Sequence, residues 1–153
     1  MSGRLYDAQV ASYGNDPRCL AMAEALVPLL RRACPVGAGG YGGSYQVNLD
    51  DEEAVGLVGV DLIRAAMRKA ARELGWKVTT IGWAGNRFGT MVAIEDTRDA
   101  PAEYRPVVEA AMHERMRTAL STVHGEPGGA PVRRNSVALM TREFQAAVAA
   151  TSA

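Results

Sequence analysis

The most regular apolar and polar pattern in the chain lies at residues 61–74, which read DLIRAAMRKAAREL. Good helix formers fill nearly every position, and Gly75 directly after the segment is a typical helix stop. At about 100° per residue, four apolar side chains share one side: Ile63, Met67, Ala70 and Leu74. Arg64, Arg68 and Arg72 recur on the other side. The pattern therefore predicts an amphipathic helix with one buried side and one basic side.

Two β-rich runs follow this helix. WKVTTIGW (76–83) and FGTMVAIE (88–95) are rich in β-branched and aromatic residues, and the short segment AGNR separates them. A short loop with glycine and asparagine between two such runs predicts a β-hairpin. Side chains alternate along a strand, so Val78, Thr80 and Gly82 should share one face and Thr79, Ile81 and Trp83 the other. Arg87 should lie near the hairpin tip.

Further elements are predicted before the helix at 61–74. Asp16-Pro17 is a typical helix start, with aspartate as N-cap and proline in the first turn. An apolar stripe continues this helix to about Ala33, and Pro28 should kink it or divide it. SYQVNL (44–49) is predicted to be a strand. Residues 50–60 stay ambiguous, since DDEEAVGLVGV suits either a short helix that makes a helix-turn-helix or a strand paired with YQVNL.

The C-terminal third predicts two helices. Pro101 opens one that runs to about Val123, and Pro106 delays its true start. Its apolar face comprises Tyr104, Val108, Ala111, Met112, Met116 and Leu120. GEPGGAPVRRNS (125–136) has the composition of a mobile linker. A last helix, at about 137–149, carries apolar residues on one side.

These elements predict a small α+β domain in which helices pack on a small antiparallel sheet, with the hairpin in the C-terminal half of the chain. The expected division is a core at 1–123, a linker at 124–136 and a helix at 137–153. This last helix would dock on the core or on a second subunit, and the terminal helices could form a homo-oligomer. The length of 153 residues suits one domain with a real core.

The uneven distribution of charged residues makes the predicted basic helix the main candidate for a functional site. The formal net charge of the chain is zero, yet residues 61–94 contain six basic and two acidic residues, a local excess of +4. A helix followed by a hairpin with a basic tip resembles the recognition helix and wing of winged-helix proteins. The candidate nucleic-acid-binding residues are Arg64, Arg68, Lys69, Arg72 and Arg87. The plainer alternative is a solvated helix face.

No catalytic motif, metal-ligand spacing or cofactor motif is convincing. Gly37, Gly39 and Gly42 match G-x-G-x-x-G, but they follow a helix and precede a strand, the reverse of a dinucleotide-binding turn. Cys19 and Cys34 lack metal-site spacing, and they are expected to be buried thiols although a disulfide is possible. His113 and His124 are expected to be surface residues. We therefore expect a binding module with no enzymatic activity, no metal and no cofactor.

The N-terminal sequence shows no signal peptide, and no apolar run could span a membrane. The expected location is cytoplasmic.

Residues 35–44 resemble part of a phage tail-completion family. That family has a helix ending in Ala-Pro, a Thr-Gly turn, an aromatic residue or leucine, and then a serine that opens a strand. Pro35, Gly39, Tyr41 and Ser44 stand at matching positions, with Ala38 in place of the threonine, and VGLVGVD (55–61) would be the second strand. The resemblance implies a structural or assembly protein that acts through protein contacts, and this is the alternative to DNA binding.

Overall fold

The computed structural model describes residue 13 and residues 15–49, 59–86, 89–124 and 136–151. Its elements follow in the order α2 (Pro17–Arg32), β1 (Ser44–Leu49), α4 (Val60–Glu73), β2 (Val78–Asn86), β3 (Gly89–Asp96), α5 (Arg105–His124) and α6 (Ser136–Thr151). Four helices and a three-stranded antiparallel sheet make up the described chain, which confirms the predicted α+β class.

The sheet has the order β1-β3-β2, so β3 is its central strand. Val92 of β3 pairs with Val47 of β1 and with Gly82 of β2. Side chains alternate across the sheet as predicted. One face carries the buried residues Tyr45, Val47, Leu49, Thr90, Val92 and Ile94. The predicted hairpin is confirmed, except that β2 extends to Asn86 through an irregularity between Trp83 and Asn86.

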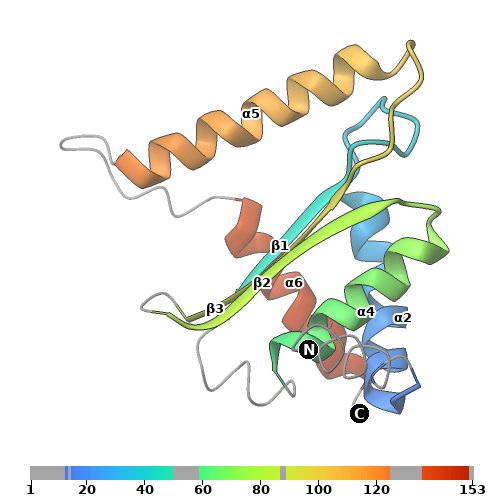
Figure 1. The fold of residues 1–153 in the computed structure, drawn as a ribbon, viewed down its shortest axis with the longest axis vertical. Coiled ribbons are helices and arrows are strands. Elements are labelled where there is room, and N and C mark those ends of the chain that lie inside the picture. Colours follow the sequence, from blue (N-terminus) through green and yellow to red (C-terminus); the bar gives the residue numbers. More distant parts are fainter. Residues whose placement is uncertain (1–12, 14, 50–58, 87–88, 125–135, 152–153) are drawn as a thin grey trace, which may run out of the picture.

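The helices lie unevenly about this sheet (Figure 1). α2 and α4 lie on one side of it and α5 lies on the other, while α6 crosses behind the strands near β1 in this view. α4 packs on α2, β2 and β3, while α6 packs on β1 and α2. The other face of the sheet includes Gln46 and the exposed Asn48, Thr79 and Ile81. Among the described residues, the buried core therefore lies on the side of the sheet that faces α2 and α4.

α4 confirms the amphipathic helix predicted at 61–74. Ile63, Met67 and Ala70 are fully buried in one cluster with residues of α2 and the sheet, and Leu74 packs against that cluster. Leu62, Ala66 and Ala71 are buried as well. The buried side is therefore wider than one apolar stripe, because α4 packs on a helix and on a sheet at the same time.

α2 begins as predicted at Pro17. Asp16 is the N-cap, and its Oδ1 accepts a hydrogen bond of 2.9 Å from the backbone N–H of Arg18. Pro28 does not divide the helix, which runs without interruption to Arg32. Pro28 is exposed, so water can reach the carbonyl that loses its helical partner there.

α6 packs on the core of its own chain. Phe144 is fully buried and Val148 nearly so. The Tyr45 hydroxyl donates a 2.9 Å hydrogen bond to the Met140 carbonyl, and the Asn48 N–H donates a 3.0 Å bond to Thr141 Oγ1. The second of these bonds covers part of the free edge of β1, which is a common form of edge protection.

α5 begins at Arg105, so residues 101–104 form a turn and Pro106 delays the helix as predicted. Arg87 lies outside the described residues, as do residues 50–58 of the ambiguous stretch at 50–60. The predicted linker at 124–136 is described only at its two ends, and both are helical: His124 is the last residue of α5 and Ser136 the first of α6. The segment VGLVGVD (55–61) would be the second strand of the phage family. Its last two residues, Val60 and Asp61, belong to α4 instead, so such a strand cannot extend through them. None of the described helices is long and apolar enough to span a bilayer.

Candidate functional site

The candidate site is the basic surface of α4, formed by Arg64, Arg68, Lys69 and Arg72. Arg64, Arg68 and Lys69 are half-buried, and Arg72 is exposed. α4 holds all four on one continuous helix between α2 and β2. The predicted residues of α4 therefore do lie together, whereas the fifth, Arg87, falls outside the described chain.

Arg64 and Arg68 converge on one hydroxyl. Arg64 Nη2 donates to Thr80 Oγ1 at 3.2 Å, and Arg68 Nη2 donates to the same oxygen at 2.9 Å. Thr80 is on β2, on the sheet face that α4 covers. One hydroxyl on the hairpin thus brings two guanidinium groups from successive turns of α4 close together.

Gly82, two residues along the same strand, leaves room for this arrangement. A Cβ atom built on Gly82 would lie 2.8 Å from Arg64 Cδ and 2.9 Å from Val60 Cγ2. Contacts this close do not occur for real Cβ atoms, so any larger residue would displace the Arg64 side chain. The glycine therefore allows the aliphatic part of Arg64 to lie directly on β2.

Two effects within this surface disfavour the charged form of Arg64. Burial, and secondarily the nearby charge of Arg68, lower the pKa of the Arg64 guanidinium. Within the described chain, Arg68, Lys69 and Arg72 form no ion pair with a carboxylate. Other arginines do: Arg98 pairs with Asp96 at 2.9 Å, and Arg18 with Asp16 at 2.7 Å.

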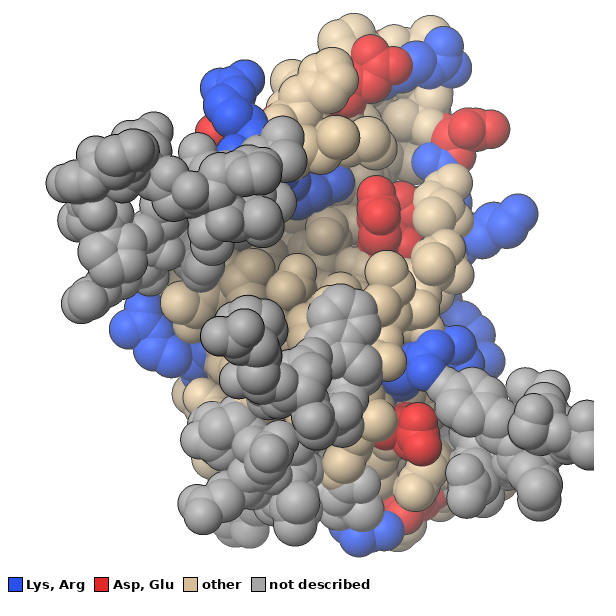
Figure 2. Space-filling model, turned by 60° about the vertical axis from the view of Figure 1, so that its left-hand side comes forward, with Lys and Arg blue, Asp and Glu red and all other residues tan. Residues whose placement is uncertain are grey.

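Figure 2 shows how charge is distributed on one face of the molecule. Basic and acidic side chains are interspersed there, and wide areas of uncharged surface separate them. This face carries no continuous basic patch among the described residues. The net charge of zero likewise gives the whole chain no general attraction for a polyanion.

The glycine-rich segment forms a second distinct feature, because α5 packs on it. A Cβ atom on Gly39 would lie 2.5 Å from the ring of Tyr104, and one on Gly42 would lie 2.8 Å from Val108 Cγ1. Both glycines also have positive φ values, 64° and 76°. Glycine at these two positions therefore lets the backbone of the segment approach Tyr104 and Val108 closely.

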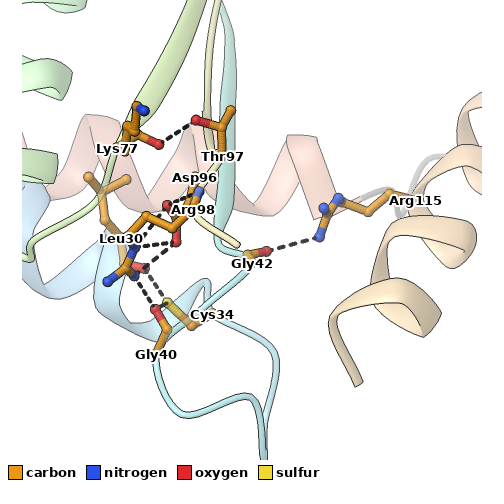
Figure 3. A network of polar contacts seen from close by, with 9 residues as sticks. All are labelled: Leu30, Cys34, Gly40, Gly42, Lys77, Asp96, Thr97, Arg98 and Arg115. Carbon is orange, nitrogen blue, oxygen red and sulfur yellow. Dashed lines mark hydrogen bonds and ion pairs between the residues drawn. The ribbon is translucent and has the colours of Figure 1, made fainter. Parts of the chain in front are cut away.

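A polar network fixes the same segment to the end of β3 (Figure 3). The Arg98 guanidinium donates to both carboxylate oxygens of the fully buried Asp96 and to the Gly40 carbonyl at 2.9 Å. It also lies 4.4 Å from the ring centre of Tyr41. The hydrogen bond to Asp96 raises the pKa of Arg98. Arg115 of α5 donates to the Gly42 carbonyl at 3.5 Å.

Sequence patterns missed this network, since Asp96 and Arg98 read as a polar turn. One feature of the sequence could have indicated the network: Asp96 ends a predicted strand, on the same strand face as Val92 and Ile94. A carboxylate that continues a buried face requires a cationic partner.

Both cysteines are free thiols, Cys19 buried and Cys34 half-buried. Burial raises the pKa of each thiol, so neither has the stabilised thiolate of a reactive cysteine. Cys34 Sγ lies 3.8 Å from the Leu30 carbonyl and 3.6 Å from the Gly40 carbonyl, to which it donates weak hydrogen bonds. Among the described residues, no group of three or more histidine, cysteine or acidic side chains could hold a metal ion. His113 is exposed on α5.

α5 leaves apolar side chains in solvent. Met112 is 40% exposed and Met116 is 58% exposed, although the sequence predicts an apolar face for this helix. The described contacts of α5 involve its first turns and the glycine-rich segment. No described helix or strand packs along the length of α5 in the way that α2 packs along α4.

Comparison of the chain with protein-family models, with curated proteins and with solved structures finds no match.

Proposed function

We propose that the protein is a binding module without catalytic activity, which contacts DNA through the basic surface of α4 and the adjacent hairpin β2–β3. The observation that carries this proposal is the group of four cations on α4, of which Arg68, Lys69 and Arg72 have no carboxylate partner within the described chain. Phosphate groups would provide the missing negative charge and release counterions on binding.

The order of the elements supports the same proposal. α4 leads through Gly75 into the hairpin β2–β3, and Thr80 of the hairpin holds two of the arginines. A helix followed by a hairpin is the arrangement of the winged-helix proteins that this segment resembles. We propose a winged-helix-like contact in which α4 and the hairpin meet the same stretch of duplex.

Fluorescence anisotropy with a labelled DNA duplex tests this function. The variant replaces Arg68, Lys69 and Arg72 with glutamine, which keeps the helix propensity. A matched control replaces the exposed Arg31, Arg105 and Arg142 with glutamine and removes the same charge elsewhere. We expect binding at low salt by the wild type and the control, and a loss of about tenfold or more in the variant, since several phosphate contacts are lost. Equal affinities of all three proteins, or no binding by the wild type at low salt, would refute the proposal.

A second candidate function is structural assembly through protein contacts. It is favoured by α5, whose methionines Met112 and Met116 are exposed one helical turn apart. Methionine adapts well to irregular protein surfaces, and exposed apolar side chains on one helix side are typical of contact sites. Light scattering after size exclusion tests self-assembly: a wild type that forms rings, and a variant with Met112 and Met116 changed to glutamine that does not, would support it. A wild type that stays monomeric at every concentration would remove it.

A further inference from the structure

β2 is an edge strand, and the hydrogen-bond pattern of the sheet shows which of its backbone groups point outward. β2 pairs with β3 on one side only. Just before β2, the Lys77 carbonyl accepts a hydrogen bond of 2.6 Å from the Thr97 N–H, so Lys77 directs its backbone towards the chain that continues β3. In an antiparallel ladder every second residue does so, and the residues between them direct their N–H and C=O groups away from the neighbouring strand. The outward residues of β2 are therefore Val78, Thr80 and Gly82.

The opposite edge of the sheet is covered, whereas the β2 edge is open. Asn48 of β1 directs its N–H outward, and this group donates to Thr141 Oγ1 of α6 at 3.0 Å. The described chain offers no such partner to the outward backbone groups of Val78, Thr80 and Gly82. This part of β2 contains neither a proline nor a bulge, the usual means of blocking an edge. The β2 edge can therefore accept a further strand.

Arginines of α4 follow this open edge. The aliphatic part of Arg64 lies on Gly82, and Arg68 Nη2 donates to Thr80 Oγ1 at 2.9 Å. These contacts show that α4 and β2 run in opposite directions, so Arg72, one turn further along α4, continues the row towards the start of β2. Four residues of a helix rise about 6 Å, and two residues of a strand rise about 6.7 Å. The row of arginines therefore keeps nearly the same spacing as the outward residues.

Arg68 and Arg72 carry the charge that an added strand would meet. Neither forms an ion pair with a carboxylate within the described chain. The bond to Thr80 uses one of the five N–H donors of Arg68, and Arg72 is exposed. Arg64, whose Nε is fully buried, packs on β2 and is not part of this pair.

We propose that the open edge of β2 binds an extended acidic segment of another protein as a fourth strand of the sheet. The backbone of that segment exchanges hydrogen bonds with Val78, Thr80 and Gly82, the mode known as β-augmentation. Side chains directly opposite each other in a ladder lie on the same face of the sheet. Acidic side chains at alternate positions of the segment therefore meet Arg68 and Arg72.

Charge decides between this partner and a second copy of the chain. A second β2 on the same edge would bring another Arg68 and another Arg72 to the same face, and like charges opposite each other are destabilising. The inference does not rest on the proposed DNA contact. An acidic segment and DNA would compete, because both require Arg68 and Arg72.

The test titrates the full chain with labelled peptides and follows fluorescence anisotropy. The parent peptide has glutamate at alternate positions and small neutral residues between them. One derivative is N-methylated at the glutamate amides, which face β2 in the proposed complex. The other carries the same number of N-methyl groups on the intervening amides, which face away from β2. The two derivatives have equal charge, so a difference between them reports strand pairing.

We expect the parent peptide and the derivative methylated between the glutamates to bind at low salt. Methylation at the glutamates should weaken binding at least about tenfold, since several backbone hydrogen bonds are lost. Combined Arg68→Gln and Arg72→Gln changes should also weaken binding of the parent peptide at least about tenfold, because charge-assisted hydrogen bonds are lost. The matched control, with the exposed Arg31 and Arg142 changed to glutamine, should bind as the wild type does.

Amide hydrogen exchange of the wild type adds a readout that needs no variant to fold. The amides of Val78, Thr80 and Gly82 should exchange quickly in the unliganded protein and slowly with the parent peptide bound. Those of Thr79 and Ile81 should be slow in both, because they already bond to β3.

Three results overturn the proposal. They are equal affinities for the two methylated peptides, unchanged exchange at Val78, Thr80 and Gly82 with the peptide bound, and no peptide binding at low salt. The last result would mean that the arginines guard the edge against other strands. Peptide binding without DNA binding would remove the function proposed above and leave the edge site intact, and DNA binding without peptide binding would do the reverse.

Discussion

At the scale of single residues, two glycines with positive φ differ in what surrounds them. Gly39 has a φ of 64° and would bring a Cβ atom to 2.5 Å from the Tyr104 ring, whereas Gly37 has a φ of 83° and open space around it. Gly37→Ala should cost about 1–2 kcal/mol of stability, from the left-handed backbone alone.

Gly39→Ala adds a steric clash to the same backbone cost, so it should destabilise the protein more than Gly37→Ala and loosen α5. Urea unfolding gives the difference in stability, and limited proteolysis within α5 reports its packing. Equal losses in the two variants would show that Tyr104 does not need the close approach to Gly39.

Asp16 makes stability depend on pH. The side-chain hydrogen bond from Arg18, with its backbone N–H and charge, lowers the pKa of Asp16 from 3.8 to about 2. Because the folded-state pKa is lower than the unfolded one, this stabilisation is fully present above about pH 4 and is lost as the pH falls towards 2.

The Asp16→Asn variant tests this dependence, since asparagine keeps the N-cap acceptor and has no charge to titrate. As the pH is lowered from 5 to 2, the melting temperature should fall less steeply for Asp16→Asn than for the wild type. The same pH dependence in both proteins would contradict the role of Asp16.

The helix start at Asp16-Pro17 was predictable from the sequence, because local chemistry decides it. The sequence pattern placed Thr80 and Gly82 on one strand face correctly, but it did not connect them to Arg64 and Arg68. That connection depends on how α4 lies across β2, and no local pattern specifies the position of one element on another.

At the scale of elements, Tyr45 fixes α6 to the sheet. Its ring is buried, and its hydroxyl donates to the Met140 carbonyl at 2.9 Å. Tyr45→Phe should cost about 0.5–1.5 kcal/mol, the usual net value of one hydrogen bond. Tyr45→Ala should cost about 3–5 kcal/mol by analogy with other large aromatic truncations. Denaturant unfolding measures both, and a Phe variant as unstable as the Ala variant would mean that the hydroxyl carries the whole contact.

Two methionines distinguish a helix in the core from one in solvent. Met67 of α4 is fully buried and Met116 of α5 is 58% exposed. Met67→Ala should cost about 2–5 kcal/mol, and Met116→Ala should change stability by less than about 0.5 kcal/mol. A large loss in Met116→Ala at low protein concentration would mean that α5 has a packing partner within the chain.

α4 and α5 show why a sequence predicts that a helix forms better than it predicts where the helix packs. α4 and α5 both offer apolar residues at helical spacing, and both form. Of the side chains described on these two helices, only those of α4 form a buried side, since α4 packs on α2, β2 and β3. The described contacts of α5 are with the glycine-rich segment. The hydrophobic pattern of α5 alone could not reveal this.

At the scale of the whole molecule, the α+β class, the strand at 44–49, the hairpin and the four described helices were predictable from periodicity and from start and stop residues. The strand order β1-β3-β2 was not, because it depends on pairing between strands far apart in the sequence. The basic surface was predictable as a set of residues on one helix. Its convergence on Thr80 required the three-dimensional arrangement.

In the proposed complex, Arg68, Lys69 and Arg72 on α4 meet phosphate groups of DNA, and the salt dependence of binding is the most direct test of these contacts. Each phosphate contact contributes about 0.9 to the slope of log K against log salt concentration for duplex DNA. Replacing these three residues with glutamine should therefore make the slope shallower by up to about 2.7. The control with Arg31, Arg105 and Arg142 replaced should keep the wild-type slope. Equal slopes for the wild type and the α4 variant would show that these three residues do not contact phosphate groups of DNA.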